Sequence, residues 1–343
     1  MRVLVTGASG FIGSFIVEQA LERDFEVWAA LRPTSSRKYL QDKRIHFIEL
    51  DLGNPAELQR QLTDFASSFP QGWDAIIHAA GATKGKSEKD FFETNLCGTR
   101  NFIEGLKACS LLPGRFIYLS SLSVLGNIRQ EPQGDNSDGH IYAPVSDTDE
   151  AQPNTAYGRS KWAAENYLRT LQDLDFVILR PTGVYGPREK DYFLMAKSIK
   201  NHIDFAVGYK PQEITFVYVK DLVSAIFIAL ERGKRAHAYF VSDGNTYSSQ
   251  DFSLLLQKEM GIRNVLHITA PLFLLRAICF VSTLLSKITG SMNALNNDKY
   301  NILKQRNWRC DITPIEELGY KAQYDLGKGV KETIAWYKKE KWI

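Results

Sequence analysis

The chain has 343 residues and a formal net charge of +3, and 44% of its residues are hydrophobic while 24% are charged. This composition is typical of a globular protein that buries a large core, as one large domain with a lobe or as two domains. No block of lysine and arginine resembles a nucleic-acid-binding arm, so no nucleic-acid partner is expected. Cysteines at 97, 109, 279 and 310 lack C-x-x-C spacing, which predicts reduced thiols without a metal site. A strand-like run begins at Arg2, leaving no room for a targeting segment, and we expect a cytoplasmic protein.

Short apolar runs rich in β-branched residues alternate with helical stretches through the first half of the chain. Strands are predicted at Val3–Thr6, Val27–Leu31, His46–Leu50, Ala75–His78, Phe116–Leu119 and Phe176–Leu179. Helices are predicted between them, including Phe11–Glu22, Pro55–Ser67 and Asp90–Ala108. Strands separated by helical patterns indicate βαβ units. We therefore predict an α/β fold with a Rossmann-type doubly wound parallel sheet.

The second half of the chain is less regular. Gly126–Thr155 is rich in Asp, Pro, Gly, Asn and Gln, which predicts a long surface excursion. A strand at Thr215–Val219 and a helix at Asp221–Glu231 are expected to return to the sheet. Residues 1–180 and 214–241 would then form the domain of the large sheet, with 181–213 and 242–343 as a smaller mixed lobe.

One segment, Pro271 to Gly290, is unusually apolar and approaches the length of a membrane span. Arg276 and Lys287 interrupt it. We expect a helix packed in the lobe or lining an apolar pocket. Peripheral contact with a membrane through residues 271–290 is the alternative.

A glycine-rich turn follows the first predicted strand, in the opening R-V-L-V-T-G-A-S-G-F-I-G. Gly7 permits a tight turn, Gly10 lets the backbone approach a pyrophosphate, and Gly13 lets the next helix pack on the strand. The helix N-terminus offers free N–H groups and a positive dipole end to phosphates. Because the motif lies between a strand and a helix, it predicts a dinucleotide site. The other predicted contacts in this turn are Ser9, Phe11 and Ile12.

The end of the second strand bears on the choice between NAD and NADP. An acidic residue there would bind the ribose hydroxyls of NAD, but Arg32 occupies the position, and Ser36 and Arg37 follow. A guanidinium suits a 2′-phosphate as a fixed charge and a bidentate donor. We predict that NADP(H) is favoured over NAD(H), with Arg32 and Ser36 in the cofactor site. The alternative is that Arg32 only stacks on adenine.

Candidate catalytic groups follow further along the chain. Tyr157 and Lys161 are four residues apart, and a helix over Ala156–Leu171 would place them on one face. A nearby ammonium would lower the pKa of the phenol, so that Tyr157 could exchange a proton with a substrate oxygen. Ser120 and Ser121 follow a predicted strand at its carboxyl end, where open α/β sheets bind ligands. A hydroxyl there can stabilise charge that develops on oxygen.

With these residues the chain resembles the extended short-chain dehydrogenases/reductases, also called the NAD-dependent epimerase/dehydratase superfamily. The matching motifs are T-G-A-S-G-F-I-G, H-A-A-G at His78–Gly81, N-L-C-G-T at Asn95–Thr99, S-S-L-S-V-L-G at Ser120–Gly126, Y-G-R-S-K, R-P-T-G-V-Y-G-P at Arg180–Pro187 and V-K-D-L at Val219–Leu222. The resemblance implies that Ser121 is the catalytic hydroxyl, Tyr157 the acid/base and Lys161 its partner. It implies a homodimer formed through the helices Asp90–Ala108 and Ala156–Leu171.

The resemblance also implies further site residues. Cofactor contacts are expected at Asp51, Leu52, Ala79, Ala80, Gly81, Asn95, Ser120, Tyr157, Lys161, Pro181 and Gly183. Substrate contacts are expected at Lys84, Ser123, Thr182 and Tyr185. His78 is expected to be structural, and Asn95 to hold backbone or a water near the site.

The motifs favour one reaction over others. Many sugar-nucleotide members carry Asn at the position of Gly183, and the R-P-T-G form looks more like the dihydroflavonol-reductase and 3β-hydroxysteroid-dehydrogenase branches. A dehydratase would need carboxylates near Leu122 and Ser123, which are absent. The leading hypothesis is reversible hydride transfer between a nicotinamide and a small-molecule ketone or secondary alcohol. The alternatives are a nucleotide-sugar epimerase with tightly bound cofactor and a non-catalytic NAD(P)-binding regulatory protein.

Overall fold

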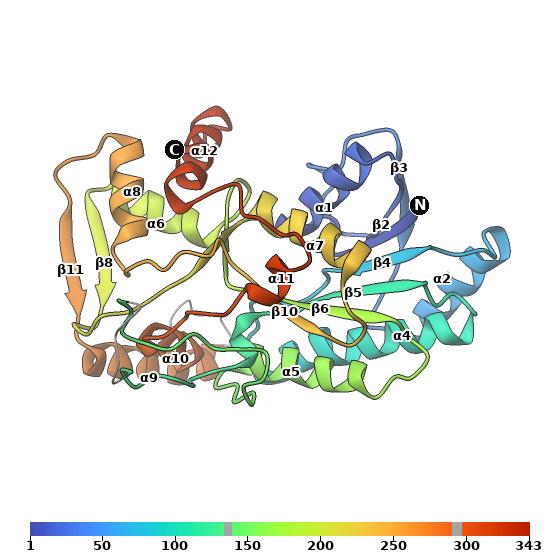
Figure 1. Cartoon of the computed structure of the whole chain (residues 1–343), viewed down its shortest axis with the longest axis horizontal. Coiled ribbons are helices and arrows are strands. Elements are labelled where there is room, and N and C mark those ends of the chain that lie inside the picture. The colour runs from blue at the N-terminus through green and yellow to red at the C-terminus, as the bar shows by residue number, and fades with distance from the viewer. Residues whose placement is uncertain (134–138, 290–296) are drawn as a thin grey trace.

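The structure is a computed structural model that describes residues 1–133, 139–289 and 297–343 (Figure 1). Its centre is a seven-stranded parallel sheet with strand order β10-β6-β5-β4-β1-β2-β3. The strands are β1 Arg2–Thr6, β2 Glu26–Leu31, β3 Ile45–Glu49, β4 Ala75–His78, β5 Arg115–Leu119, β6 Phe176–Pro181 and β10 Ala238–Val241. The predicted doubly wound α/β fold is confirmed.

Helices cover both faces of this sheet (Figure 1). One face packs against α1 (Phe11–Glu22) and α7 (Val219–Arg232), and the other against α2 (Pro55–Ser68), α4 (Gly98–Ala108) and α5 (Ala156–Arg169). Successive strand side chains point to opposite faces, so Val3 and Val5 join the first core and Leu4 the second. Most of these strands are buried on both faces and are continuous apolar runs, whereas the edge strand β3 leaves His46, Phe47 and Glu49 exposed.

The helix predicted at Asp90–Ala108 is built from three parts. A short helix α3 (Glu88–Phe92) leads into a π-helical turn, η1 (Glu93–Cys97), and then into α4. A π-turn shifts the side chains that follow it, and such turns are frequent at functional sites. Here it contains the buried Asn95.

The smaller part of the molecule is formed by elements outside the large sheet. Two two-stranded parallel ribbons pair β7 (Gly183–Tyr185) with β9 (Phe216–Tyr218) and β8 (Ile203–Val207) with β11 (Leu266–Ala270). The helices of this part are α6 Asp191–Lys200, α8 Asp251–Met260, α9 Leu272–Thr289, α10 Asn297–Lys304 and α12 Leu326–Lys339, whereas α11 Thr313–Glu316 packs against β10 of the large sheet.

One expectation for this half of the chain is wrong. The strand at Thr215–Val219 does not return to the large sheet, because β9 pairs with β7; the seventh strand is β10, after α7. The helix α9 buries Leu275 and Cys279 on one side, while Phe273 and Phe280 are exposed on the other. Within the described residues no helix meets the length and hydropathy needed to cross a bilayer.

Candidate active site

The glycine turn between β1 and α1 has the geometry that a phosphate cradle requires. Gly7 has a φ of +67°, and a Cβ on it would lie 2.7 Å from the Ala79 carbonyl oxygen. A Cβ on Gly13 would lie 2.1 Å from the Gly7 carbonyl oxygen, so the helix can pack this closely only on a glycine. Gly10 is the N-cap of α1 and has no capping side chain. The first N–H groups of α1 are therefore available to an anion, and this fits a dinucleotide pyrophosphate.

The residues expected near the adenosine lie beyond the ends of the neighbouring strands. Arg32 follows β2 and is exposed, and among the described residues no ion pair forms with its guanidinium. Asp51 follows β3, where its carboxylate accepts a hydrogen bond from the Gly53 N–H at 3.1 Å. The Leu52 carbonyl accepts from Asn101 on α4. Ser36 is exposed and its hydroxyl accepts from the Lys38 N–H.

The loop after β4 is fixed by three buried polar side chains. His78 makes hydrogen bonds with Thr6 Oγ1 at 2.9 Å and Thr99 Oγ1 at 3.0 Å, and the Ala80 N–H donates to the same Thr6 oxygen at 3.2 Å. Burial, and then the Lys161 ammonium, lower the pKa of His78 to about 3, so His78 stays neutral. His78 therefore ties β4 and its loop to β1, in agreement with the structural role expected for it.

Asn95 connects the same loop to α5. Its amide oxygen accepts from the Ala82 N–H at 2.8 Å, while Nδ2 donates to the Ala82 carbonyl and to Ser160 Oγ. The π-turn η1 brings this side chain beneath Gly81, where a Cβ would lie 2.9 Å from Asn95 Oδ1. The expectation that Asn95 holds backbone agrees with these contacts.

The candidate catalytic residues are assembled by the close approach of α5 to the turn after β5. Ser121 caps the 3-10 turn η2 (Leu122–Val124) by accepting from the Ser123 N–H at 3.2 Å, and it donates to Ser123 Oγ at 3.1 Å. A Cβ on Gly158 would lie 2.5 Å from the Ser123 carbonyl oxygen, so glycine permits this approach. Tyr157 thereby comes within hydrogen-bonding reach of Ser121.

The pKa of Tyr157 differs from the expectation. Burial raises it, and hydrogen bonding with Ser121 only partly opposes the rise. The Lys161 ammonium donates instead to the Leu119 carbonyl at 2.8 Å. Burial lowers the pKa of Lys161 to about 8, although the Glu165 carboxylate opposes this change. The expected lowering of the phenol pKa by Lys161 is therefore wrong for this arrangement, and Tyr157 is a protonated phenol at neutral pH.

A buried ion pair behind the site was not anticipated. Glu165 on α5 binds Arg180 on β6 with a 2.6 Å contact, and Ser120 donates to the same carboxylate at 2.5 Å. The hydroxyl of Ser120, which is among the expected cofactor contacts, is thus hydrogen-bonded to a buried carboxylate. Losing one partner of such a pair costs about 3–5 kcal/mol, which makes it part of the frame that holds α5.

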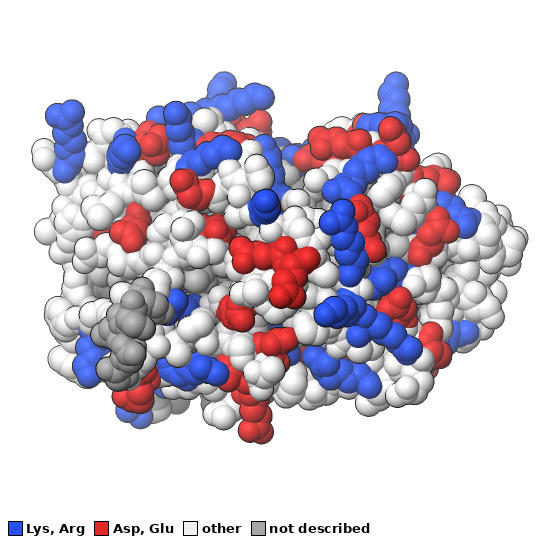
Figure 2. All heavy atoms as spheres, in the orientation of Figure 1, with Lys and Arg blue, Asp and Glu red and all other residues white. Residues whose placement is uncertain are grey.

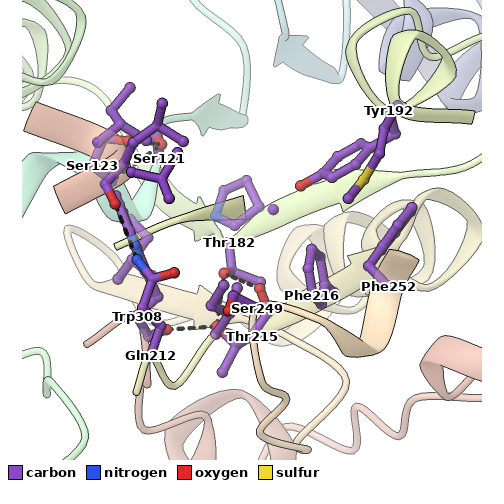
Figure 3. Close-up of a pocket in the computed structure, with 18 of the residues that line it drawn as sticks. Ser121, Ser123, Thr182, Tyr192, Gln212, Thr215, Phe216, Ser249, Phe252 and Trp308 are labelled. Carbon is purple, nitrogen blue, oxygen red and sulfur yellow. Dashed lines mark hydrogen bonds between the residues drawn. The ribbon is translucent and has the colours of Figure 1, made fainter. Parts of the chain in front are cut away.

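A cavity of about 390 Å³ opens next to Ser121 (Figure 3). Its catalytic end is formed by Ser121, Ser123, Pro181, Thr182 and Gly183. The rest of its wall comes from the smaller part of the molecule and includes Tyr192, Phe205, Val207, Phe216, Phe252, Ile302, Leu303 and Trp308. Among the described residues no Asp, Glu, Lys, Arg or His lines this cavity. Its polar side-chain groups are hydroxyls, one amide and the indole N–H of Trp308, and the wall is mostly apolar.

The expected substrate residues divide into two groups. Ser123 and Thr182 line the cavity, and Thr182 Oγ1 donates to the Thr215 carbonyl. Tyr185 is buried away from it in an aromatic cluster and donates to the Asp325 carbonyl, while Lys84 forms an exposed ion pair with Asp191. Neither of these last two side chains lines the cavity, contrary to expectation.

Most of the cavity wall was not identified from the sequence. Phe205, Ile302, Leu303 and Trp308 lie in segments without a motif, and only folding brings them together. Tyr192 follows the R-P-T-G-V-Y-G-P motif closely, and its hydroxyl points toward the cavity (Figure 3). Its position close to this motif is the only feature of the sequence that points to Tyr192 as a residue of the cavity wall.

Comparison with known proteins agrees with this geometry. UDP-glucose 4-epimerase of Vibrio cholerae is 25% identical over 346 residues, covering 96% of this chain and 94% of that protein. Ceramide reductase of Caulobacter vibrioides is 23% identical over 343 residues, covering 99% and 96%. The crystal structure of UDP-glucose 4-epimerase from Thermotoga maritima with UDP-glucose has a TM-score of 0.75 at 20% identity, covering 99% of each chain, and shares the fold.

Residues 3–242 match the NAD dependent epimerase/dehydratase family. This range contains the glycine turn, Ser121, Tyr157 and Lys161, and it spans more than half of the chain. The chain therefore belongs to the NAD dependent epimerase/dehydratase family and is an NAD(P)-dependent enzyme.

Proposed function

We propose that this enzyme catalyses reversible hydride transfer between a nicotinamide cofactor and an apolar ketone or secondary alcohol. The observation that carries the proposal is the cavity beside Ser121, whose described lining has no ionised side chain. A nucleotide sugar brings a diphosphate, and a buried phosphate needs cationic or directed N–H partners. An apolar molecule with one carbonyl suits hydroxyls at one end and Phe, Ile, Leu and Trp elsewhere.

Gly183 supports the same substrate class. A Cβ at this position would lie 2.6 Å from the Tyr192 hydroxyl and 3.2 Å from Phe216 Cδ1. An asparagine there, as in many sugar-nucleotide relatives, would displace these rings or fill the cavity. The reductase activity in the name of the Caulobacter relative is also consistent with an apolar substrate.

The catalytic roles follow from the contacts of the three side chains. Ser121 donates a hydrogen bond to the substrate oxygen and holds it beside Tyr157. During reduction Tyr157 gives its proton to that oxygen, and during oxidation it takes the proton back. Burial raises the pKa of the phenol, so at neutral pH Tyr157 holds the proton that reduction requires. The nicotinamide, when bound, supplies or accepts the hydride.

Lys161 has a different part in the proposed site. Its ammonium lies beneath the loop after β4, since a Cβ on Gly81 would be 3.0 Å from Lys161 Nζ. In this position it would hold the hydroxyls of the nicotinamide ribose.

We also propose that NADP(H) is used in preference to NAD(H). Arg32 is exposed at the end of β2, and among the described residues no carboxylate neutralises it. A free guanidinium there can form charge-assisted hydrogen bonds with a 2′-phosphate. Ser36 lies four residues further on and can add a hydroxyl contact.

A screen with purified enzyme tests the function. NADPH absorbance is followed with apolar ketones, such as steroid ketones and long-chain 3-keto compounds, and with UDP-sugars in parallel. We expect NADPH consumption with an apolar ketone and little nicotinamide released from the purified protein by denaturation. Stoichiometric bound NAD(H), interconversion of UDP-sugars and no ketone reduction would overturn the proposal and favour the epimerase.

A further inference from the structure

The ribbon of β8 and β11 has one face made only of apolar side chains. The pairing places Ile203, Phe205 and Val207 opposite Leu266, Ile268 and Ala270, and residues two apart in a strand share a face. Phe205 is 61% exposed and Leu266 63%. The other face carries the buried Asp204, which accepts from Ser253 of α8. The apolar face is therefore turned away from α8 toward solvent.

The helix α9 continues this surface. It begins directly after β11 and Pro271, and the Gly208 N–H at the end of β8 donates to the Ala270 carbonyl, which keeps the two segments together. Leu275 and Cys279 are buried, while Phe273 and Phe280 are 76% and 62% exposed. Because residues four apart share a helix face, the buried pair marks the inner side. We call the exposed side chains of Phe205, Leu266, Ile268, Phe273, Phe280 and Val281 the apolar end.

Basic residues border the apolar end. Lys200 and Arg263 precede the two strands, and Lys210 and Arg276 follow them, all exposed. The sequence has no Asp or Glu from 260 to 297, and the carboxylates between 192 and 213, Asp204 and Glu213, are buried. In Figure 2 the end over β8 and β11 is largely white, with basic side chains above and below it and a few acidic side chains among them. Exposed apolar area with a basic rim is complementary to an anionic lipid surface.

The apolar end is also continuous with the cavity. Phe205 and its neighbour Val207 line the cavity that reaches Ser121, so β8 belongs both to the exposed surface and to the cavity wall. A molecule leaving a lipid layer at β8 would meet apolar side chains along its path to the catalytic hydroxyl. A second copy of the chain is a poorer occupant, because a symmetric contact would bring two basic rims together.

We propose that the apolar end docks on anionic lipid membranes and that the apolar substrate enters the cavity from the bilayer. The substrate part of this inference rests on the proposed function, whereas the docking part does not. Exposed apolar side chains would enter the region between headgroups and acyl chains, and Arg276 and Lys210 would remain at the level of the phosphates.

Co-sedimentation with vesicles tests the docking. Full-length enzyme is mixed with phosphatidylcholine vesicles with or without phosphatidylglycerol, at low and high salt. We expect binding to the anionic vesicles that salt weakens. The double variant Phe273→Glu/Phe280→Glu should bind at least about tenfold more weakly, since two apolar contacts are lost and two repulsive charges are added. Phe47→Glu, an exposed phenylalanine on β3 at the far end of the molecule (Figure 1), is the matched control and should bind like wild type.

Activity measurements separate this inference from the proposed function. Neither Phe273 nor Phe280 lines the cavity, so the double variant should reduce a water-soluble ketone at the wild-type rate and lose rate only on a vesicle-embedded ketone. Absence of wild-type binding, equal binding to neutral vesicles, or undiminished binding of the double variant would overturn the docking. A wild-type dimer that the double variant converts to monomer would also overturn it, in favour of a second copy. Docking without any ketone reduction would instead overturn the proposed function, and with it the entry of a ketone from the bilayer, while the docking itself would stand.

Discussion

Replacing His78 with glutamine should change the acid sensitivity of the fold. His78 is buried with its ring between Thr6 and Thr99, and its pKa falls from 6.5 to about 3. Below pH 6.5 His78 binds a proton in the unfolded chain, whereas in the folded chain it stays neutral until about pH 3. The stability that the neutral ring contributes is therefore complete above pH 6.5 and is lost as the pH falls toward 3. Between about pH 7.5 and about pH 5 the loss amounts to about 2 kcal/mol.

Urea unfolding followed by tryptophan fluorescence at those two pH values measures this difference. Carboxylates also titrate in the interval, but they do so in both proteins and cancel in the comparison. His78→Gln should be less stable than wild type at the higher pH, yet should lose about 2 kcal/mol less on acidification. Equal acid losses in wild type and His78→Gln would refute the assignment of a buried neutral ring.

Three further predictions concern the cofactor and the cavity. Arg32→Asp should weaken NADPH binding by about 10- to 100-fold and favour NADH, because repulsion replaces two or more charge-assisted hydrogen bonds to the 2′-phosphate. Fluorescence titration with both cofactors measures the two affinities, and an unchanged preference for NADPH would contradict the proposed contact between Arg32 and the 2′-phosphate. The kcat/KM for NADPH should fall as the pH rises through about 8, where Lys161 loses its proton. A kcat/KM that stays constant well above pH 8 would show that the reaction does not require the Lys161 ammonium. Gly183→Asn should lower kcat/KM for an apolar ketone at least about tenfold and destabilise the fold by about 1–3 kcal/mol, because the new Cβ would meet Tyr192 and Phe216. If the variant had the kinetic constants of the wild type, the substrate would not occupy the part of the cavity beside Gly183.

The sequence was informative where local pattern determines structure. Six strands of the large sheet were predicted within two residues at each end, and all of them except the exposed edge strand β3 are mostly buried apolar runs. The glycine turn was equally readable, since a left-handed Gly7 and the contact between Gly7 and Gly13 allow little else. Motif spacing also located Ser121, Tyr157 and Lys161, which α5 and η2 bring together.

Features that depend on contacts between distant segments were not predicted. The composition of β9 resembles that of a strand in the large sheet, yet its backbone pairs with β7 in a two-stranded ribbon. The pKa of Tyr157 depends on how deeply α5 is buried and on the hydrogen bond that Lys161 donates to the Leu119 carbonyl. The apolar character of 271–290 was visible, but whether α9 is covered depends on packing around Leu275 and Cys279. The cavity wall likewise joins residues more than a hundred positions apart.

The most direct test of the central claim compares wild type with Tyr157→Phe in single-turnover reduction of an apolar ketone by NADPH. The proposed mechanism predicts that the wild type oxidises NADPH and that the variant binds NADPH with the same affinity while losing turnover by at least about a hundredfold. Ser121→Ala should show a similar loss if its hydroxyl holds the substrate oxygen. Ketone reduction by Tyr157→Phe at the wild-type rate would contradict the assignment of Tyr157 as the proton donor.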